Sequence, residues 1–304
     1  PGITYYYQVG DGSTWSDKQS FKTPAANAEA TNFFILGDIQ SSDTSNLAHV
    51  LDVLKTSETA YDFALQTGDA IDNVTEYVKN WRPFLTTVNS DKLNGVDLIH
   101  VLGNHEYRGN TQAMMDYSEI SRRWNMPDRY YTKVFEEKGA TIRIVWIDTT
   151  PLIDKYRNES DKYPDAYKQD ISKQLLWLES VLASAKEDWI IVAGHHPIYA
   201  YTPKEESERL DMQKRVDSIL RKHNVDMYIC GHIHNFQHIR VPGSDIDYVV
   251  NSAASLARKV EPIEGTNFCR PEPGFSVCSI DKKELNLRMI DKKGNVLYTV
   301  TRKK

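Results

Sequence analysis

The chain has 304 residues, enough for one large α/β domain or two unequal domains with a sizeable core. Its 37 basic and 42 acidic residues give a net charge of -5, so we expect no basic surface for nucleic acid. No apolar run approaches the roughly 18 residues of a transmembrane helix, so we expect no membrane span.

The first two dozen residues predict two strands, Thr4–Val9 and Lys18–Thr23, joined by a Gly-Asp-Gly-Ser turn. A two-stranded hairpin alone is at best marginally stable in water. The pattern P-G-I-T-Y-Y-Y-Q-V-G-D-G…W-S…S-F-K-T-P resembles the last two strands of a fibronectin type III-like module. We therefore expect residues 1–24 to end such a domain and residues 25–304 to form a second one, with Ala25–Thr31 as a linker.

From Asn32 onward, short apolar runs alternate with helical patterns, which predicts an α/β fold whose parallel strands are buried on both faces. The predicted strands are Phe33–Leu36, Phe63–Gln66, Leu98–Leu102, Ile142–Ile147, Trp189–Ala193 and Met227–Cys230. Apolar residues at helical spacing predict three amphipathic helices. Their stripes are Leu47, Val50, Leu51 and Leu54; Ile171, Leu175, Leu178 and Leu182; and Leu210, Val216, Ile219 and Leu220 within Glu206–His223. After Tyr248 the pattern predicts antiparallel strands.

Three cysteines cannot all pair within one chain. Cys230 lies in an apolar run, which predicts a buried thiol. Cys269 and Cys278 are close enough in sequence for a disulfide, but spacing cannot show whether their geometry fits, so both states stay open.

Five of the predicted strands are followed by a glycine and then by side chains that can bind metal ions. These motifs are Gly37-Asp38-Ile39-Gln40, Gly68-Asp69, Gly103-Asn104-His105-Glu106, Gly194-His195-His196-Pro197 and Gly231-His232-Ile233-His234. Because ligands of α/β sheets bind beyond the carboxyl ends of the strands, we expect these residues to converge. Aspartate, asparagine and histidine together suit Zn, Fe or Mn.

Each motif alone has an ordinary explanation. A Gly-Asp after a strand is more often a turn or a helix cap than a metal ligand. His232 and His234 lie two residues apart and could be a pair of solvated surface histidines. Five such motifs, each at the end of a predicted strand, favour one common site.

In these motifs the chain resembles the calcineurin-like metallophosphoesterases, and among them the purple acid phosphatases and their bacterial relatives. The resemblance covers most of the chain from Phe33 onward and implies a four-layer αββα sandwich. It also implies two metal ions, one held by Asp38, Asp69 and His234 and the other by Asp69, Asn104, His195 and His232. The fibronectin-like lead-in is the kind that precedes the catalytic domain of plant purple acid phosphatases, which implies a secreted, periplasmic or cell-surface protein.

The chain departs from the purple enzymes at three positions. Their iron-binding tyrosine, three residues after the bridging aspartate, is Asp72 here, so we expect no purple colour. Many family members have histidine where this chain has Gln40, whose amide could bind the metal weakly or hold a bound water. An additional histidine of the plant enzymes is replaced by Glu205.

The resemblance also implies a mechanism, in which two metal ions activate a shared water and clamp the oxygens at phosphorus. Asn104 would hold one ion in place. His105 would stabilise the transition state or protonate the leaving alcohol; the alternative is that it only supports a ligand. His196 could line the pocket or simply end a strand. Asp72 is expected to orient a ligand.

We therefore predict a binuclear metal-dependent phosphomonoesterase acting on small phosphate esters. A phosphodiesterase with the same machinery stays open, because the sequence does not separate the two. A catalytically silent surface module, suggested by the fibronectin-like lead-in, is the third possibility; the complete ligand set argues against it.

Overall fold

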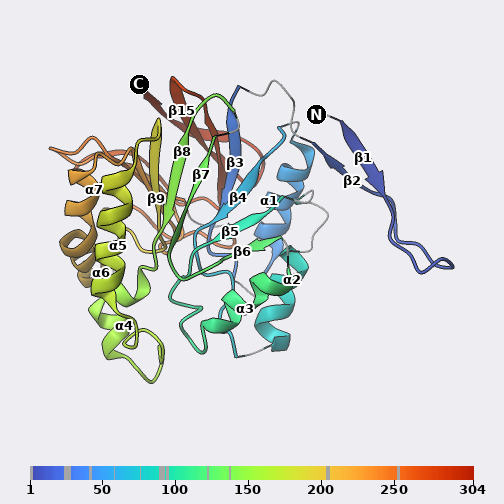
Figure 1. Ribbon diagram of the computed structural model, residues 1–304, viewed down its shortest axis with the longest axis horizontal. Helices are drawn as coiled ribbons and strands as arrows, with labels where there is room; N and C mark the ends of the chain where they lie inside the picture. Colours follow the sequence, from blue (N-terminus) through green and yellow to red (C-terminus); the bar gives the residue numbers. More distant parts are fainter. Residues whose placement is uncertain are drawn as a thin grey trace.

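The computed structural model describes residues 3–23, 29–40, 43–57, 59–75, 77–88, 93, 96–121, 123–136, 138–202, 206–251 and 254–304. Its main body consists of two seven-stranded sheets packed face to face between two groups of helices (Figure 1). This is the four-layer arrangement that the resemblance implied.

The first sheet has the strand order β16-β15-β14-β3-β4-β5-β6. Strands β3 to β6 are parallel, and β14 to β16 add an antiparallel meander to the β3 edge. The strands are β3 (Thr31–Leu36), β4 (Phe63–Gln66), β5 (Leu98–His100), β6 (Trp124–Asn125), β14 (Gly274–Ile280), β15 (Glu284–Asp291) and β16 (Val296–Lys303). Because β3 begins at Thr31, the predicted linker is one residue too long; most of it lies outside the described residues.

The second sheet has the order β13-β11-β12-β10-β9-β8-β7. Strands β8, β9, β10 and β12 are parallel, whereas β7, β11 and β13 run antiparallel to their neighbours. The strands are β7 (Tyr131–Phe135), β8 (Ile142–Trp146), β9 (Trp189–Ala193), β10 (Met227–Cys230), β11 (Phe236–Ile239), β12 (Asp247–Val250) and β13 (Thr266–Arg270).

Alternate side chains of each central strand face the two sides of its sheet. Phe33 and Ile35 of β3 pack into the layer between the sheets, and Phe34 and Leu36 pack against the helices. Both faces are therefore apolar, which explains why these strands are continuous hydrophobic runs in the sequence. The six predicted parallel strands are confirmed to within two residues at each end.

The helices form the two outer layers (Figure 1). They are α1 (Ser45–Thr56), α2 (Arg82–Val88), α3 (Gln112–Ile120), α4 (Asp154–Asn158), α5 (Ile171–Ser184), α6 (Glu206–Met212) and α7 (Ser218–Lys222), with π-helical turns η1 (Tyr77–Trp81) and η4 (Gln213–Asp217) and a 3-10 turn η3 (Thr150–Leu152). Helices α1, α2 and α3 lie beside the first sheet and α4 to α7 beside the second.

The predicted stripe of the third helix is wrong at its start. Leu210 is 56% exposed, and the buried residues of α6 are Glu208 and Met212. The turn η4 joins α6 to α7 and shifts the helical phase, so that Val216 and Leu220 continue the face that contains Glu208. A carboxylate thus occupies a core position where an apolar residue was expected.

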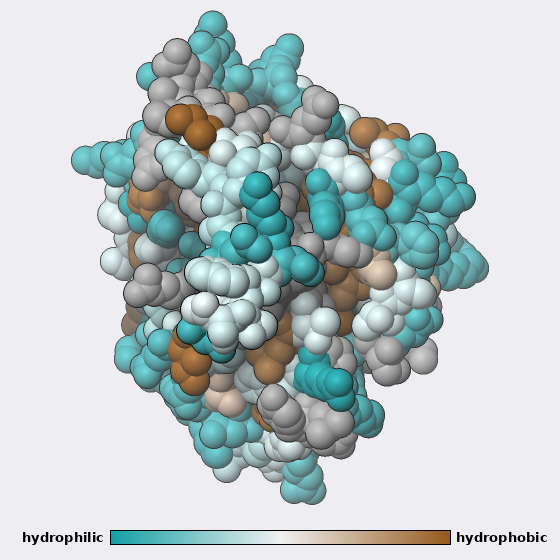
Figure 2. All heavy atoms as spheres, turned by 90° about the vertical axis from the view of Figure 1, so that its right-hand side faces the viewer, coloured by the Kyte–Doolittle hydropathy of each residue, from teal (hydrophilic) through white to brown (hydrophobic). Residues whose placement is uncertain are grey.

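The N-terminal residues form a separate hairpin of β1 (Thr4–Tyr7) and β2 (Gln19–Lys22), which projects from the body (Figure 1). Tyr5, Tyr6 and Trp15 are each 46–64% exposed. Figure 2 looks at this side of the molecule and shows mostly hydrophilic and pale residues, with brown ones in separate patches. The two strands are confirmed at Thr4–Tyr7 and Gln19–Lys22, but their assignment to a fibronectin-like domain stays a prediction.

All three cysteines are free thiols. Cys230 is buried, as predicted, and Cys278 of β14 lies in the layer between the sheets. Cys269 belongs to β13 of the other sheet, so the disulfide that the spacing left open is not formed. No helix among the described residues has the length and apolarity to cross a membrane.

Candidate metal centre

The five motifs lie in the loops that directly follow β3, β4, β5, β9 and β10. Because the strands within each sheet are parallel, these loops all lie at the carboxyl ends of the strands. The loops of the first sheet meet those of the second at this end. One residue of each loop contacts a residue of another, so that the six predicted ligands form one cluster. Asp38, Asp69, Asn104, His195 and His234 are all at most 5% exposed.

The cluster is built on strained backbone. Among the described residues other than glycine, five have a positive φ, and four of them are predicted ligands: Asp38 (49°), Asp69 (55°), His232 (75°) and His234 (57°). The fifth, Asn224, follows His223, the residue that caps α7. A left-handed conformation costs an ordinary residue roughly 1–3 kcal/mol and tends to persist at functional sites. The sharp turns thus fall mainly on the polar residues themselves.

The glycines of the motifs mainly provide space. A Cβ atom on Gly103 would meet Asp69 Oδ1 at 2.2 Å, and one on Gly68 would meet His195 Nδ1 at 2.5 Å. Gly68 also has a φ of +92°, so it alone among the motif glycines both leaves space for a neighbouring ligand and adopts a left-handed conformation.

Three electron-pair donors converge on the imidazole of His195, which supplies a fourth. Its Nδ1 lies 2.7 Å from the carbonyl oxygen of Thr67, to which it donates, so Nε2 carries the lone pair. That Nε2 lies 3.2 Å from Asn104 Oδ1, 3.3 Å from Asp69 Oδ2 and 3.2 Å from His232 Nδ1. Acceptors this close repel one another unless a proton or a cation lies among them. They are the set predicted for the second metal ion.

Asp38 organises the other half of the cluster. Its carboxylate accepts from the backbone N–H of His232 at 3.1 and 3.0 Å and lies 3.4 Å from His234 Nε2. One oxygen each of Asp38 and Asp69 and a nitrogen of His195 lie within 4.8 Å of one another. Asp69 therefore stands between the two predicted ligand sets.

The buried charge fits a cation. Among the described residues, neither Asp38 nor Asp69 has a lysine or arginine nitrogen within 4.0 Å, although both carboxylates are buried. Buried carboxylates normally pair with a cation or bind a metal, because burying an uncompensated charge is costly. Donors of this kind match a Zn, Fe or Mn site.

Burial and the neighbouring charges also shift the pKa values of the cluster. Burial raises the pKa of Asp38 above its ordinary value. Burial would also raise the pKa of Asp69, but His105 and His195 hold it well below the usual range. In turn Asp69 raises the pKa of His195 despite its burial. Positive charge is therefore favoured at the point where the ligands meet.

Glu106 fixes the loops of the second and third motifs to each other. Its buried carboxylate accepts from the backbone N–H groups of Asp69, Ala70, Ile71 and Gly103 at 2.6–3.1 Å. These bonds hold the left-handed turn at Asp69 in place.

Glu208 was not predicted from the sequence. It is 1% exposed and accepts from His232 Nε2 at 2.8 Å, from Tyr156 at 2.7 Å and from Lys155 at 3.0 Å. Because His232 donates from Nε2, its Nδ1 carries the lone pair that faces His195. The sequence offers no local signal for it, because its burial depends on the helical phase that the turn η4 sets.

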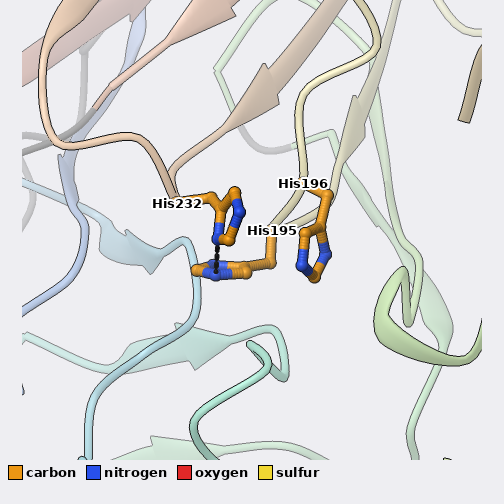
Figure 3. A group of neighbouring side chains, drawn as sticks. All are labelled: His195, His196 and His232. Atoms are coloured by element: carbon orange, nitrogen blue, oxygen red, sulfur yellow. Dashed lines mark hydrogen bonds between the residues drawn. The ribbon is translucent and has the colours of Figure 1, made fainter. Parts of the chain in front are cut away.

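His196 lies beside the cluster rather than within the predicted ligand set. Figure 3 shows His195, His196 and His232 grouped at the strand ends, with the contact between His232 and His195 as a dashed line. His196 Nδ1 lies 2.8 Å from Thr149 Oγ1, while its buried Nε2 has no hydrogen-bond partner. Ligand atoms of the three histidines lie within 4.8 Å of one another.

His105 lies at the open side of the cluster. Its backbone N–H donates to Asp69 at 2.9 Å, and its Nδ1 lies 2.7 Å from Asp72 Oδ1, which also accepts from Arg108 at 2.9 Å. Asp72 therefore orients His105 and contacts none of the predicted ligands. Asp69 and Asp72 raise the pKa of His105 against the effect of burial.

Gln40 reaches Asp69 with its amide. Nε2 lies 3.4 Å from Asp69 Oδ2, and the buried Oε1 has no hydrogen-bond partner. Turning the amide would bring the oxygen toward the cluster. Glu205 lies outside the described residues.

Comparison with known proteins places this site in a family. The model of the family described as calcineurin-like phosphoesterase matches residues 31–236. The chain belongs to the calcineurin-like phosphoesterase family. It is 30% identical to tartrate-resistant acid phosphatase type 5 of Rattus norvegicus over 257 residues, which cover 78% of this chain and 77% of the rat protein. It is 28% identical to purple acid phosphatase 17 of Arabidopsis thaliana over 84% of this chain and 76% of the plant protein.

The fold of this phosphoesterase also matches solved structures. GAP50, described as the anchor in the inner membrane complex of Plasmodium, superposes with a TM-score of 0.73 at 22% identity, covering 90% of this chain and 89% of that one. At this identity the likeness concerns the fold alone. Family and relatives together make the chain an acid phosphatase-like hydrolase of phosphoric esters with a binuclear metal centre.

Proposed function

We propose that this phosphoesterase is a phosphomonoesterase whose first metal ion is held by Asp38, Asp69 and His234 and whose second is held by Asp69, Asn104, His195 and His232. One observation carries the proposal: three other donor atoms lie within 3.3 Å of His195 Nε2, each from a different loop. The bound ions would supply Lewis-acid charge that makes a water nucleophilic near neutral pH and attracts the phosphoryl oxygens.

His105 is the group best placed to handle the leaving oxygen. Asp72 fixes its Nδ1, so Nε2 faces the pocket that Gln40 and His234 also line. When protonated, Nε2 can donate to the leaving alkoxide, and Asp72 stabilises the imidazolium that makes this donation possible. Arg108 lies 3.0 Å from Nε2 and donates to it while Nε2 is unprotonated, so a protonated Nε2 requires Arg108 to move aside toward Asp72, to which it already donates.

Asn104 and Glu208 help to position the groups that would bind the second metal ion. Asn104 directs its amide oxygen at the point shared by His195 and Asp69, and Glu208 sets the tautomer of His232. Gln40 lines the same pocket and can hold a water beside Asp69. His196 supports His232 through ring contact, with centroids 4.4 Å apart.

Metal-loaded protein tests the assignment by its turnover of p-nitrophenyl phosphate and bis-p-nitrophenyl phosphate. We expect the monoester to be preferred, and we expect Asp69→Asn to lose activity and metal content together. A strong preference for the diester would establish a phosphodiesterase instead. Absence of turnover with both metal sites filled would favour a non-catalytic role. Action outside the cytoplasm stays a prediction, supported by the resemblance of the N-terminal hairpin.

A further inference from the structure

The cavity beside the metal centre is small, and most of the residues that line it are polar or charged. It measures about 280 Å³, just below the range of about 300–1,000 Å³ typical of ligand pockets. Its lining consists of Gln40, Asp72, Lys79, Asn80, His105, His234, Leu256 and Arg258. A compact substrate fits such a space better than a macromolecule does.

The formal charge of this lining is positive, although the whole chain is acidic. Among the described residues that line it, Asp72 is the one carboxylate, and its charge is matched by Arg108 at 2.9 Å and by His105 at 2.7 Å. Lys79 and Arg258 are both exposed members of the lining. The cavity therefore presents the cationic group of Arg258 in addition to the charge of the metal centre, and Lys79 also lies on its lining.

Arg258 is available to a ligand. Within the part of the chain that the structure describes, its guanidinium makes no hydrogen bond or ion pair. Its backbone is nevertheless fixed, because its N–H donates to the carbonyl oxygen of His234 at 2.7 Å. Its positive charge is close enough to contribute to the lowered pKa of His234, after the larger effect of burial. An unpaired arginine is thus anchored next to a predicted metal ligand.

We propose that the preferred substrate carries a second phosphate group on the part that leaves, and that Arg258 binds this group. The inference rests on the proposed function, which places the transferred phosphate at the metal centre. A guanidinium can bind two phosphate oxygens at once. The substrate class is therefore small bisphosphorylated molecules.

The test compares fructose 6-phosphate with fructose 1,6-bisphosphate, which differ by the second phosphate. Binding is measured by calorimetry on metal-loaded His105→Asn protein, in which turnover is slow. We expect the bisphosphate to bind about tenfold more tightly, as one exposed charge-assisted contact allows. Arg258→Ala in this background should reduce the preference to about twofold, and Arg258→Lys should keep part of it. High salt should also weaken the preference.

Lys259→Ala is the matched control, because it removes the neighbouring charge, whose ammonium is already paired with Glu261 at 2.5 Å. It should keep the full preference. Equal binding of the two sugars, or an unchanged preference in Arg258→Ala, overturns the inference. Turnover of p-nitrophenyl phosphate by the wild type is measured separately: its failure would refute the proposed function while the binding ratio still decides the role of Arg258.

Discussion

Replacing Glu208 by glutamine tests how the second metal site is held. Oε1 of Glu208 accepts from Tyr156 and Lys155, and Oε2 accepts from His232 Nε2. Glutamine has only one acceptor oxygen. If that oxygen stays with Tyr156 and Lys155, the NH₂ group faces His232 Nε2, and His232 must move its proton to Nδ1 to avoid two opposed donors. Nδ1 is the atom that lies 3.2 Å from His195 Nε2, so the change removes one ligand lone pair.

Loss of an outer partner of a metal-binding histidine typically lowers metal affinity about 10–100-fold, or about 1.4–2.8 kcal/mol. We expect this decrease for one of two Zn²⁺ equivalents when metal-free Glu208→Gln is titrated calorimetrically. Nitrogen NMR of His232 should show the proton on Nδ1 instead of Nε2. Glu179→Gln is the control, because Glu179 pairs with His223 at 3.0 Å in the same way but away from the cluster. Affinities within twofold of the wild type, with an unchanged tautomer, would show that Glu208 does not set the tautomer of His232.

Three further outcomes follow from the structure. His105→Asn should lower kcat about 10²–10⁴-fold with both metal ions retained; a loss of metal instead would make His105 a supporting residue. Iron-loaded protein should lack an intense visible band, because Asp72 contacts His105 where the purple enzymes have a tyrosine; absorption spectroscopy decides this. Asp148 is buried beside Tyr107, and burial raises its pKa to about 7. The wild type therefore loses stability as the pH rises from about 4 to 7, because the buried carboxyl group must ionise. Asp148→Asn should be more stable than the wild type above pH 7, by up to about 4 kcal/mol. Below pH 4 the two proteins should be equally stable. Urea unfolding at pH 8.5 and pH 4 measures the difference, and a constant gap would contradict it.

Strands buried on both faces could be predicted from the sequence because their signal is local. A run such as Trp189–Ala193 is apolar at every position, since the sheet has one core on each side. Strand β7 was missed because its residues are half-exposed at an edge of the second sheet and show no alternation. Strand β6 was missed because two residues carry no periodicity.

The convergence of the predicted ligands could be inferred because each motif follows a buried strand. The carboxyl ends of parallel strands lie on the same side of a sheet, so residues that follow them lie close together. The sequence does not predict roles that depend on contacts between residues far apart in the chain. Glu208 was not predicted, because the π-helical turn η4, which changes the helical phase, has no sequence signature. Asp72 was expected to orient a metal ligand, but only the fold shows that its partner is His105.

The proposed catalytic site requires two metal ions that lie among six side chains from five loops. X-ray diffraction of metal-loaded crystals, collected at the absorption edge of the bound metal, tests this directly. We predict two anomalous peaks that share Asp69, one next to Asp38 and His234 and the other next to His195 and His232. A single peak, or peaks that do not contact Asp69, would contradict the binuclear site.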